Sequence, residues 1–158
     1  MDKNKAIIAY LLTCADIYNS PLYFNLADVK DGINSIIQQA NDRNVERPYI
    51  DGSVKKRYWI TLQCFVSITN NPIVKAAGID NENVTEVADI QKLIDWIVTQ
   101  NDNKNFPNFG PDCIIDEIRT TTDNPRLDQI DATTSTPLAR YSFTIVVDYI
   151  DNSKKLWK

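Results

Sequence analysis

The sequence predicts an α+β domain, with a mainly antiparallel sheet and two main helices packed on one face. Residues 55–68 and 140–150 alternate apolar and polar side chains, which is the pattern of strands with one buried face. Residues 3–18 and 81–99 instead repeat apolar residues at helical spacing. No internal repeat or shift in composition divides the chain, so we expect a single domain over residues 1–158.

The first predicted helix runs from Lys3 to Tyr18. Its apolar side chains recur three and four positions apart, as on one face of a helix: Ile7, Ile8, Leu11, Leu12 and Ala15. We expect the helix to end before Pro21, because proline disfavours the helical conformation in the residue that precedes it. The apolar run is short for a secretion signal and Asp16 follows it closely, so the helix is interpreted as part of the mature protein.

The region between this helix and the first long strand gives weaker signals. Residues 22–29 are short and mixed in character, and residues 33–37 are compatible with a strand. Residues 41–48 are polar and are interpreted as a connection that carries Arg43 and Arg47.

A hairpin is predicted at Tyr49-Ile50-Asp51-Gly52-Ser53. The Asp51-Gly52 pair favours a two-residue type I′ turn, which needs positive φ at both central residues. Three basic residues follow, and the chain then alternates to the predicted end of the strand at Asn70-Asn71-Pro72. One face is predicted to carry Tyr58, Ile60, Leu62, Cys64, Val66 and Ile68, and the other face contains one clearly apolar exception, Phe65.

The second half of the chain begins with the helix predicted over Asn81–Thr99. Acidic residues occupy its first turns, where the helix dipole favours them (Glu82, Glu86 and Asp89), and Trp96 is expected at the edge of its apolar stripe. That stripe consists of Val84, Val87, Ile90, Leu93, Ile94 and Ile97.

The rest of the chain is predicted as two strands joined by loops. Residues 105–111 form an aromatic, proline-rich loop, residues 113–121 a strand and residues 122–138 a long loop. The last strand, 140–150, is predicted to direct Tyr141, Phe143, Ile145, Val147 and Tyr149 to one face.

The chain lacks the residue types and spacings on which most enzymes and metal sites depend. It contains no histidine, so it has no Ser-His or Cys-His nucleophile pair. Its three cysteines are far apart and are predicted to be thiols rather than metal ligands, and its four glycines are too scattered for a phosphate-binding loop. Asp116 and Glu117 are strand neighbours that should point to opposite faces. We therefore predict a protein that is not an enzyme, with no catalytic residues, no metal and no cofactor.

Charge and hydropathy also bear on the partners. The net charge of −4 argues against binding nucleic acid by neutralising phosphates. No segment is apolar over the length of a membrane span, so no membrane partner is expected.

The ordered set of motifs resembles small structural proteins of long-tailed bacteriophages, called minor capsid or minor tail proteins, of the tail-terminator type. The motifs are, in order, the first helix, Tyr49-Ile50-Asp51-Gly52-Ser53 before an aromatic-rich strand, Ile94-Asp95-Trp96-Ile97, Asn105-Phe106-Pro107-Asn108-Phe109-Gly110, and Leu138-Ala139-Arg140-Tyr141 through Tyr149. Residues 22–44 depart from this pattern.

The resemblance implies a six-fold ring at the head-proximal end of the tail tube. Such a ring ends tube growth and joins the tail to the head connector. The implied partners are further copies of the chain, the major tail tube protein and the head-completion protein, with DNA only passing through the lumen. The implied location is the virion tail, assembled in the bacterial host cytoplasm.

The candidate interface residues fall into three groups. The basic hairpin, expected to face an acidic surface of a neighbouring subunit, contributes Arg47, Tyr49, Asp51, Gly52, Lys55, Lys56 and Arg57. The aromatic loop contributes Phe106 and Phe109. The loop 122–138, expected to be mobile until it orders at the ring lumen or the tube, contributes Asp123, Asp128 and Asp131.

Two alternatives stay open. One is a head-completion or connector protein, which also forms rings. The other is a cytosolic ligand-binding α+β module, with a pocket lined by Trp59, Phe65, Phe106 and Phe109.

Overall fold

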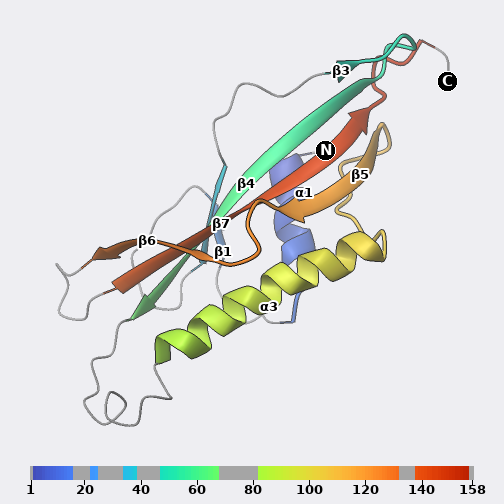
Figure 1. Cartoon of the computed structure of the whole chain (residues 1–158). Coiled ribbons are helices and arrows are strands. Elements are labelled where there is room, and N and C mark those ends of the chain that lie inside the picture. Colours follow the sequence, from blue (N-terminus) through green and yellow to red (C-terminus); the bar gives the residue numbers. More distant parts are fainter. Residues whose placement is uncertain are drawn as a thin grey trace.

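The computed structural model describes residues 2–15, 22–24, 34–38, 47–67, 82–131 and 138–156. They form a seven-stranded sheet with two helices packed against it, so the predicted α+β class is confirmed (Figure 1). The predictions for residues 16–21, 25–33, 39–46, 68–81 and 132–137 lie outside the described residues.

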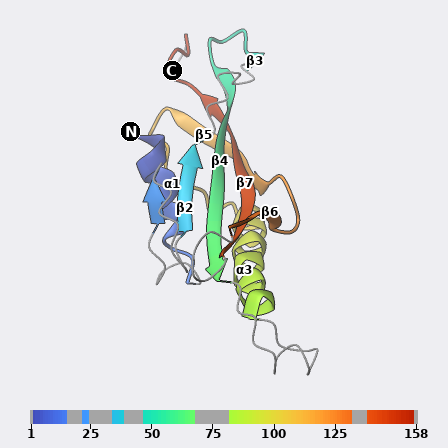
Figure 2. The same cartoon turned by 90° about the vertical axis from the view of Figure 1, so that its left-hand side faces the viewer.

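Two long strands run through the middle of the sheet. β4 (Val54–Ser67) and β7 (Leu138–Asp151) pair antiparallel over 14 residues each, from Val54 opposite Asp151 to Ser67 opposite Leu138. Both strands match the predicted alternating segments. Figure 2 shows them crossing the domain from end to end.

Shorter strands complete the sheet on both sides of this pair. β2 (Asn34–Gln38) lies antiparallel to β4, and β1 (Leu22–Phe24) lies parallel to β2. On the other side, β5 (Cys113–Thr120) and β6 (Arg126–Asp131) both pair with β7. The sheet is therefore antiparallel except for β1 and β2.

The hairpin at the start of β4 differs from its prediction. β3 (Arg47–Pro48) pairs with Lys55 and Val54, and the Tyr49 N–H donates to the Ser53 carbonyl at 2.8 Å. The loop thus contains three residues rather than two. Gly52 has φ +84°, whereas Asp51 has no positive φ, so the type I′ assignment is wrong and the positive φ of Gly52 is confirmed. Loops of three residues favour a turn followed by one residue in the left-handed conformation, and glycine fills that place here.

Both helices pack on one face of the sheet, as predicted. α1 (Lys3–Leu11) contributes Ile7 and Leu11, and α3 (Glu82–Asp102) contributes Ile94 and Ile97 to a single core cluster. The same cluster contains the predicted apolar faces of the long strands: Tyr58, Ile60, Leu62 and Cys64 of β4, with Phe143, Ile145, Val147 and Tyr149 of β7. Trp96 packs at the edge of this cluster, and its ring lies 5.0 Å from that of Tyr10.

Three predicted element boundaries need correction. The first helix ends at Leu11 rather than Tyr18, and a turn over residues 12–15 follows it, in which the N–H groups of residues 12–14 donate back to helix carbonyls. The second ends at Asp102, three residues beyond its predicted end. Within the predicted loop 122–138, residues 126–131 form a strand, β6, that hydrogen-bonds to the first part of β7.

The three cysteines are thiols without a disulfide, as predicted: Cys14 and Cys64 are buried and Cys113 is half-buried. No helix among the described residues is long and apolar enough to cross a membrane.

Candidate functional site

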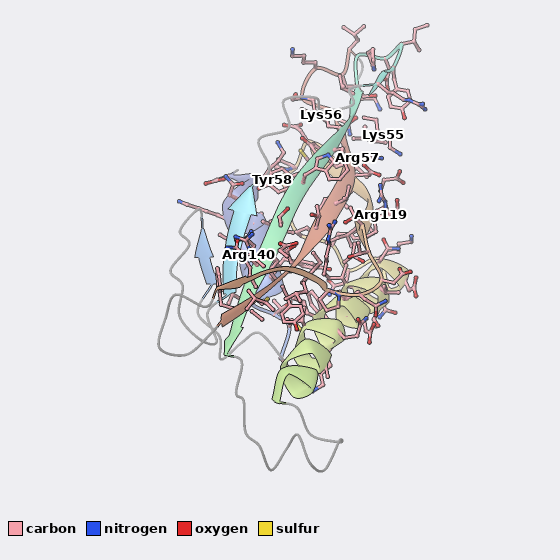
Figure 3. The ribbon with its side chains drawn as sticks, turned by 60° about the vertical axis from the view of Figure 1, so that its left-hand side comes forward. Lys55, Lys56, Arg57, Tyr58, Arg119 and Arg140 are labelled. Carbon is pink, nitrogen blue, oxygen red and sulfur yellow. The ribbon has the colours of Figure 1, made fainter. Side chains whose placement is uncertain are left out.

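The face of the sheet opposite the helices carries a row of ion pairs. Successive side chains of a strand point to opposite faces of the sheet. Tyr58 of β4 belongs to the core on the helix side, so Arg57 and Lys55 lie on the face opposite the helices. Lys55 Nζ lies 2.6 Å from Asp116 of β5, and Arg57 holds Asp148 of β7 through Nε at 2.5 Å and Nη2 at 3.0 Å. Figure 3 labels Lys55 and Arg57 near the start of β4, and Arg119 nearer to α3.

Asp148 is the centre of this row. It is only 5% exposed, and Arg119 of β5 approaches it from the other side at 3.6 Å. A buried carboxylate needs such partners, since desolvation is otherwise costly. The hydrogen bonds from Arg57 to Asp148 raise the pKa of the guanidinium further above its usual value. Arg57 also lies over the Trp59 ring, 5.6 Å from its centroid.

A β-bulge arranges the acidic partners on β5. The pairing register with β7 shifts between Ile115 and Glu117, so Asp116 is an extra residue in the strand. Asp116 bonds to Lys55, and Glu117 lies 3.3 Å from Arg119 on the same face. The prediction that Asp116 and Glu117 point to opposite faces is therefore wrong, because the bulge interrupts the alternation.

A basic hollow lies beside this row, where the hairpin leaves the sheet. Its volume is about 340 Å³, and it is lined by Arg47, Lys55, Lys56, Arg57 and Asp148. Lys55 and Lys56 bind Asp116 and Asp151 at 2.6 and 2.9 Å. Three of the four cations thus have a carboxylate of this chain as partner, and the predicted basic hairpin presents less unpaired charge than its sequence indicates.

The hairpin tip is joined to the C-terminal tail. The Leu156 N–H donates to the Asp51 carbonyl at 2.8 Å, and Lys155 Nζ lies 3.4 Å from the Asp51 carboxylate. Hydrogen bonds from Ser53 lower the pKa of Asp51. Three apolar side chains remain exposed around this joint: Tyr49 at 46%, Ile50 at 97% and Leu156 at 68%.

The aromatic residues proposed for an interface or a pocket lie on two sides of the sheet. Phe109 is 4% exposed and packs edge-on between Tyr58 and Tyr149, with ring centroids 5.6 and 5.5 Å away. Phe106 is partly buried against the same core. Phe109 therefore belongs to the core, and Phe106 packs against that core. The expectation that Phe109 lies on a contact surface does not agree with its burial.

Trp59 and Phe65 lie two and eight residues after Arg57 on β4. Their side chains therefore point to the same face as Arg57, the face that bears the ion pairs. They cannot line one pocket with Phe106 and Phe109, because the sheet lies between them. The prediction that these four residues line one ligand-binding pocket is therefore wrong.

The three predicted loop aspartates lie on β6 and on the connection before it. Asp123 is exposed, and its carbonyl accepts a hydrogen bond of 2.9 Å from Gln91 Nε2 of α3. Asp128 sits at a second bulge, 3.9 Å from Arg140 Nε, and Asp131 pairs through its backbone with Leu138. Arg140 Nε is buried and accompanied by no hydrogen-bond partner.

Sequence reasoning missed several residues that matter here. Asp148 offered one signal, since it is a single charge within the apolar run Val146-Val147-Asp148-Tyr149. Leu156, Leu127 and Ile130 offered none, because isolated apolar residues in polar segments are common on protein surfaces.

No protein family model matches the chain, and no curated protein is significantly similar to it.

Proposed function

We propose that this chain is a non-enzymatic virion protein that forms a ring at the head-proximal end of a phage tail tube. The ring ends tube growth and joins the tail to the head connector. Its partners are further copies of the chain, the tail tube protein and the head-completion protein, and DNA only passes through its lumen. The protein acts in the virion tail after assembly in the host cytoplasm.

The observation that carries the proposal is that a sheet covered on one face by helices continues into an arm that projects beyond them. Two helices cover one face of the sheet, and the opposite face is crossed by ion pairs at Asp116 and Asp148. The hairpin and the tail extend the sheet beyond the helices at one end (Figure 1). A ring subunit needs separate surfaces for its two neighbours, and an arm beside a covered sheet is consistent with that need.

The ordered motifs give independent support. The hairpin motif and the last strand of the resemblance are the partners that form the two central strands, β4 and β7. The aromatic motif packs Phe109 against both strands through Tyr58 and Tyr149. The motifs thus act together to build one structural unit, as expected of features shared by a fold.

The test is removal of the gene from the phage that carries it. Tails of abnormal length, without attached heads, are expected in electron micrographs, and expression of the wild-type chain in trans should restore normal particles. Purified protein added to tail tubes should place a six-fold ring at one end. Normal tails in the deletion would refute the proposal. Complete heads that leak DNA, with tails of normal length, would instead favour the head-completion alternative.

A further inference from the structure

The basic hollow at the start of β4 contains one cation that the described residues leave without an acidic partner. The cations that line it are Arg47, Lys55, Lys56 and Arg57. Lys55, Lys56 and Arg57 each bind one carboxylate of β5 or β7, at distances of 2.5–2.9 Å. Arg47 is exposed and forms no ion pair with any described residue. The hollow therefore has a surplus of one positive charge over the carboxylates that its cations bind.

Strand pairing brings this unpaired cation next to a second one. Arg47 of β3 is directly opposite Lys55 of β4. Directly opposite residues of an antiparallel pair point to the same face, with Cβ atoms about 5 Å apart, and like charges in this position destabilise the pair. An anion held between Arg47 and Lys55 would replace this repulsion with attraction to both.

Both side chains have donors available for such an anion. The Lys55–Asp116 pair is partly exposed, with 33% and 55% of the two side chains accessible, and exposed ion pairs are weak. Lys55 can therefore share its three N–H donors between Asp116 and a ligand. The guanidinium of Arg47 is a planar fork that matches the two oxygens of a carboxylate.

The one carboxylate in the lining does not oppose an incoming anion strongly. Asp148 is only 5% exposed and is bound by Arg57 from one side and by Arg119 from the other. Arg119 also lies 3.3 Å from Glu117, so it adds a further ion pair and not a further unpaired charge. The charge of Asp148 is thus compensated within the protein.

A single carboxylate fits this charge distribution better than a nucleic acid backbone. The surplus is one positive charge, whereas binding of nucleic acid depends on neutralising several successive phosphates. Asp116 and Glu117 lie near the cations of the hollow with 55% and 45% of their side chains exposed, and they would repel the further charges of a polyanion.

We propose that the hollow is a binding site for a carboxylate group, which the fork of Arg47 and the ammonium of Lys55 hold together. Lys55, Lys56 and Arg57 follow one another on β4 beside it (Figure 3). The carboxylate belongs either to a small organic acid or to an acidic side chain of a protein. The site goes beyond the proposed tail function and does not depend on it.

The test is an NMR titration of the full chain at low ionic strength with two capped tripeptides that differ only in charge. Acetyl-Gly-Glu-Gly-amide should shift the amide signals of residues 47 and 54–57 in a saturable way, with a Kd on the order of 1–10 mM. Acetyl-Gly-Gln-Gly-amide should not. Acetate serves as a third probe: affinity equal to that of the Glu peptide would identify a small acid as sufficient, and weaker affinity would identify a protein side chain as the source.

Arg47→Gln should weaken binding of the Glu peptide at least about threefold. Because Arg47 is exposed, this variant should fold. The matched control is Arg126→Gln, which removes the same charge from an exposed arginine of β6 and should bind like the wild type.

The proposal is overturned if the Glu peptide gives no saturable shift up to about 50 mM, a range in which even a weak site would fill. Equal shifts with the Gln peptide, or equal affinities of the wild type and Arg47→Gln, would also overturn it. The same holds for an equal loss in both arginine variants, which would indicate a general effect of net charge. Tighter binding of dimethyl phosphate than of acetate would overturn the carboxylate assignment in favour of a phosphodiester.

Discussion

A side chain at residue 52 would meet two obstacles. Gly52 has φ +84°, which L residues adopt at a cost, and a Cβ there would lie 2.5 Å from the Lys154 carbonyl oxygen. The first obstacle belongs to the turn, and the second belongs to the tail that packs on it.

We therefore expect Gly52→Val to lower the free energy of unfolding by more than about 2 kcal/mol. Gly52→Asn removes most of the backbone strain but keeps the close contact, so it should cost less and still destabilise the protein. Urea denaturation measures both variants. In a chain truncated after Asn152 the penalty for Gly52→Asn should shrink, because Lys154 is then absent. An unchanged penalty would show that the tail does not pack on the hairpin.

The ionisation of Asp151, at the same end of the molecule, makes the free energy of unfolding depend on pH. Hydrogen bonds from Ser153 and then from Lys56 lower the pKa of its carboxyl well below the usual range. A carboxyl whose pKa is lower in the folded state stabilises the fold above its unfolded pKa of about 3.9 and loses that contribution as the pH falls.

Asp151→Asn should consequently destabilise the protein by about 1–2 kcal/mol at pH 7. The difference from the wild type should decline as the pH falls below about 4 and should disappear only when the carboxyl becomes protonated in the folded state. Thermal unfolding measured across this range provides the comparison. A difference that is constant with pH would mean that the ionised form gains nothing from Ser153 and Lys56.

At the scale of the elements, two side chains on one face of β4 form ion pairs, and the two carboxylates that they bind differ in solvent exposure. The Asp148 side chain of the Arg57 pair is 7% exposed, whereas the Asp116 side chain of the Lys55 pair is 55% exposed. Exposed pairs contribute little, but removing one partner of a buried pair leaves a charge without compensation.

Arg57→Ala should thus cost about 2–3 kcal/mol, with Arg119 retaining part of the compensation. Lys55→Ala should cost less than about 1 kcal/mol. Chemical denaturation measures both. Adding Asp148→Asn to Arg57→Ala should recover part of the loss, because the buried charge is then removed. Equal costs for Arg57→Ala and Lys55→Ala would contradict the assignment of Asp148 as a buried charge.

At the scale of the whole molecule, stability should follow the order of the sheet. β4 and β7 each have neighbouring strands on both sides, and their inner faces contribute Ile60, Leu62 and Ile145 to the core without measurable exposure. β6 has β7 on one side only, among the described strands.

Amide hydrogen exchange should therefore be slowest in residues 58–64 and 143–149 and much faster in residues 126–131. Slow exchange of the β6 amides in the monomer would indicate that residues other than the described ones protect this strand from solvent.

The sequence by itself determined the features that depend on local periodicity and turn chemistry. Alternation located β4 and β7, a short apolar run located β5, helical spacing located α1 and α3, and Gly52 marked the hairpin. These features follow from backbone geometry, which repeats every two residues in a strand and every 3.6 in a helix.

The tertiary structure decided what depends on partners distant in the chain. The bulges at Asp116 and Asp128 arise only when β5 and β6 pair with β7, and they change which side chains share a face. β6 itself is too polar to be recognised as a strand, and its pairing with β7 supplies the hydrogen bonds that fix it. The position of Leu156 beside Asp51 likewise exists only after the chain folds back on itself, since 105 residues separate them in the sequence.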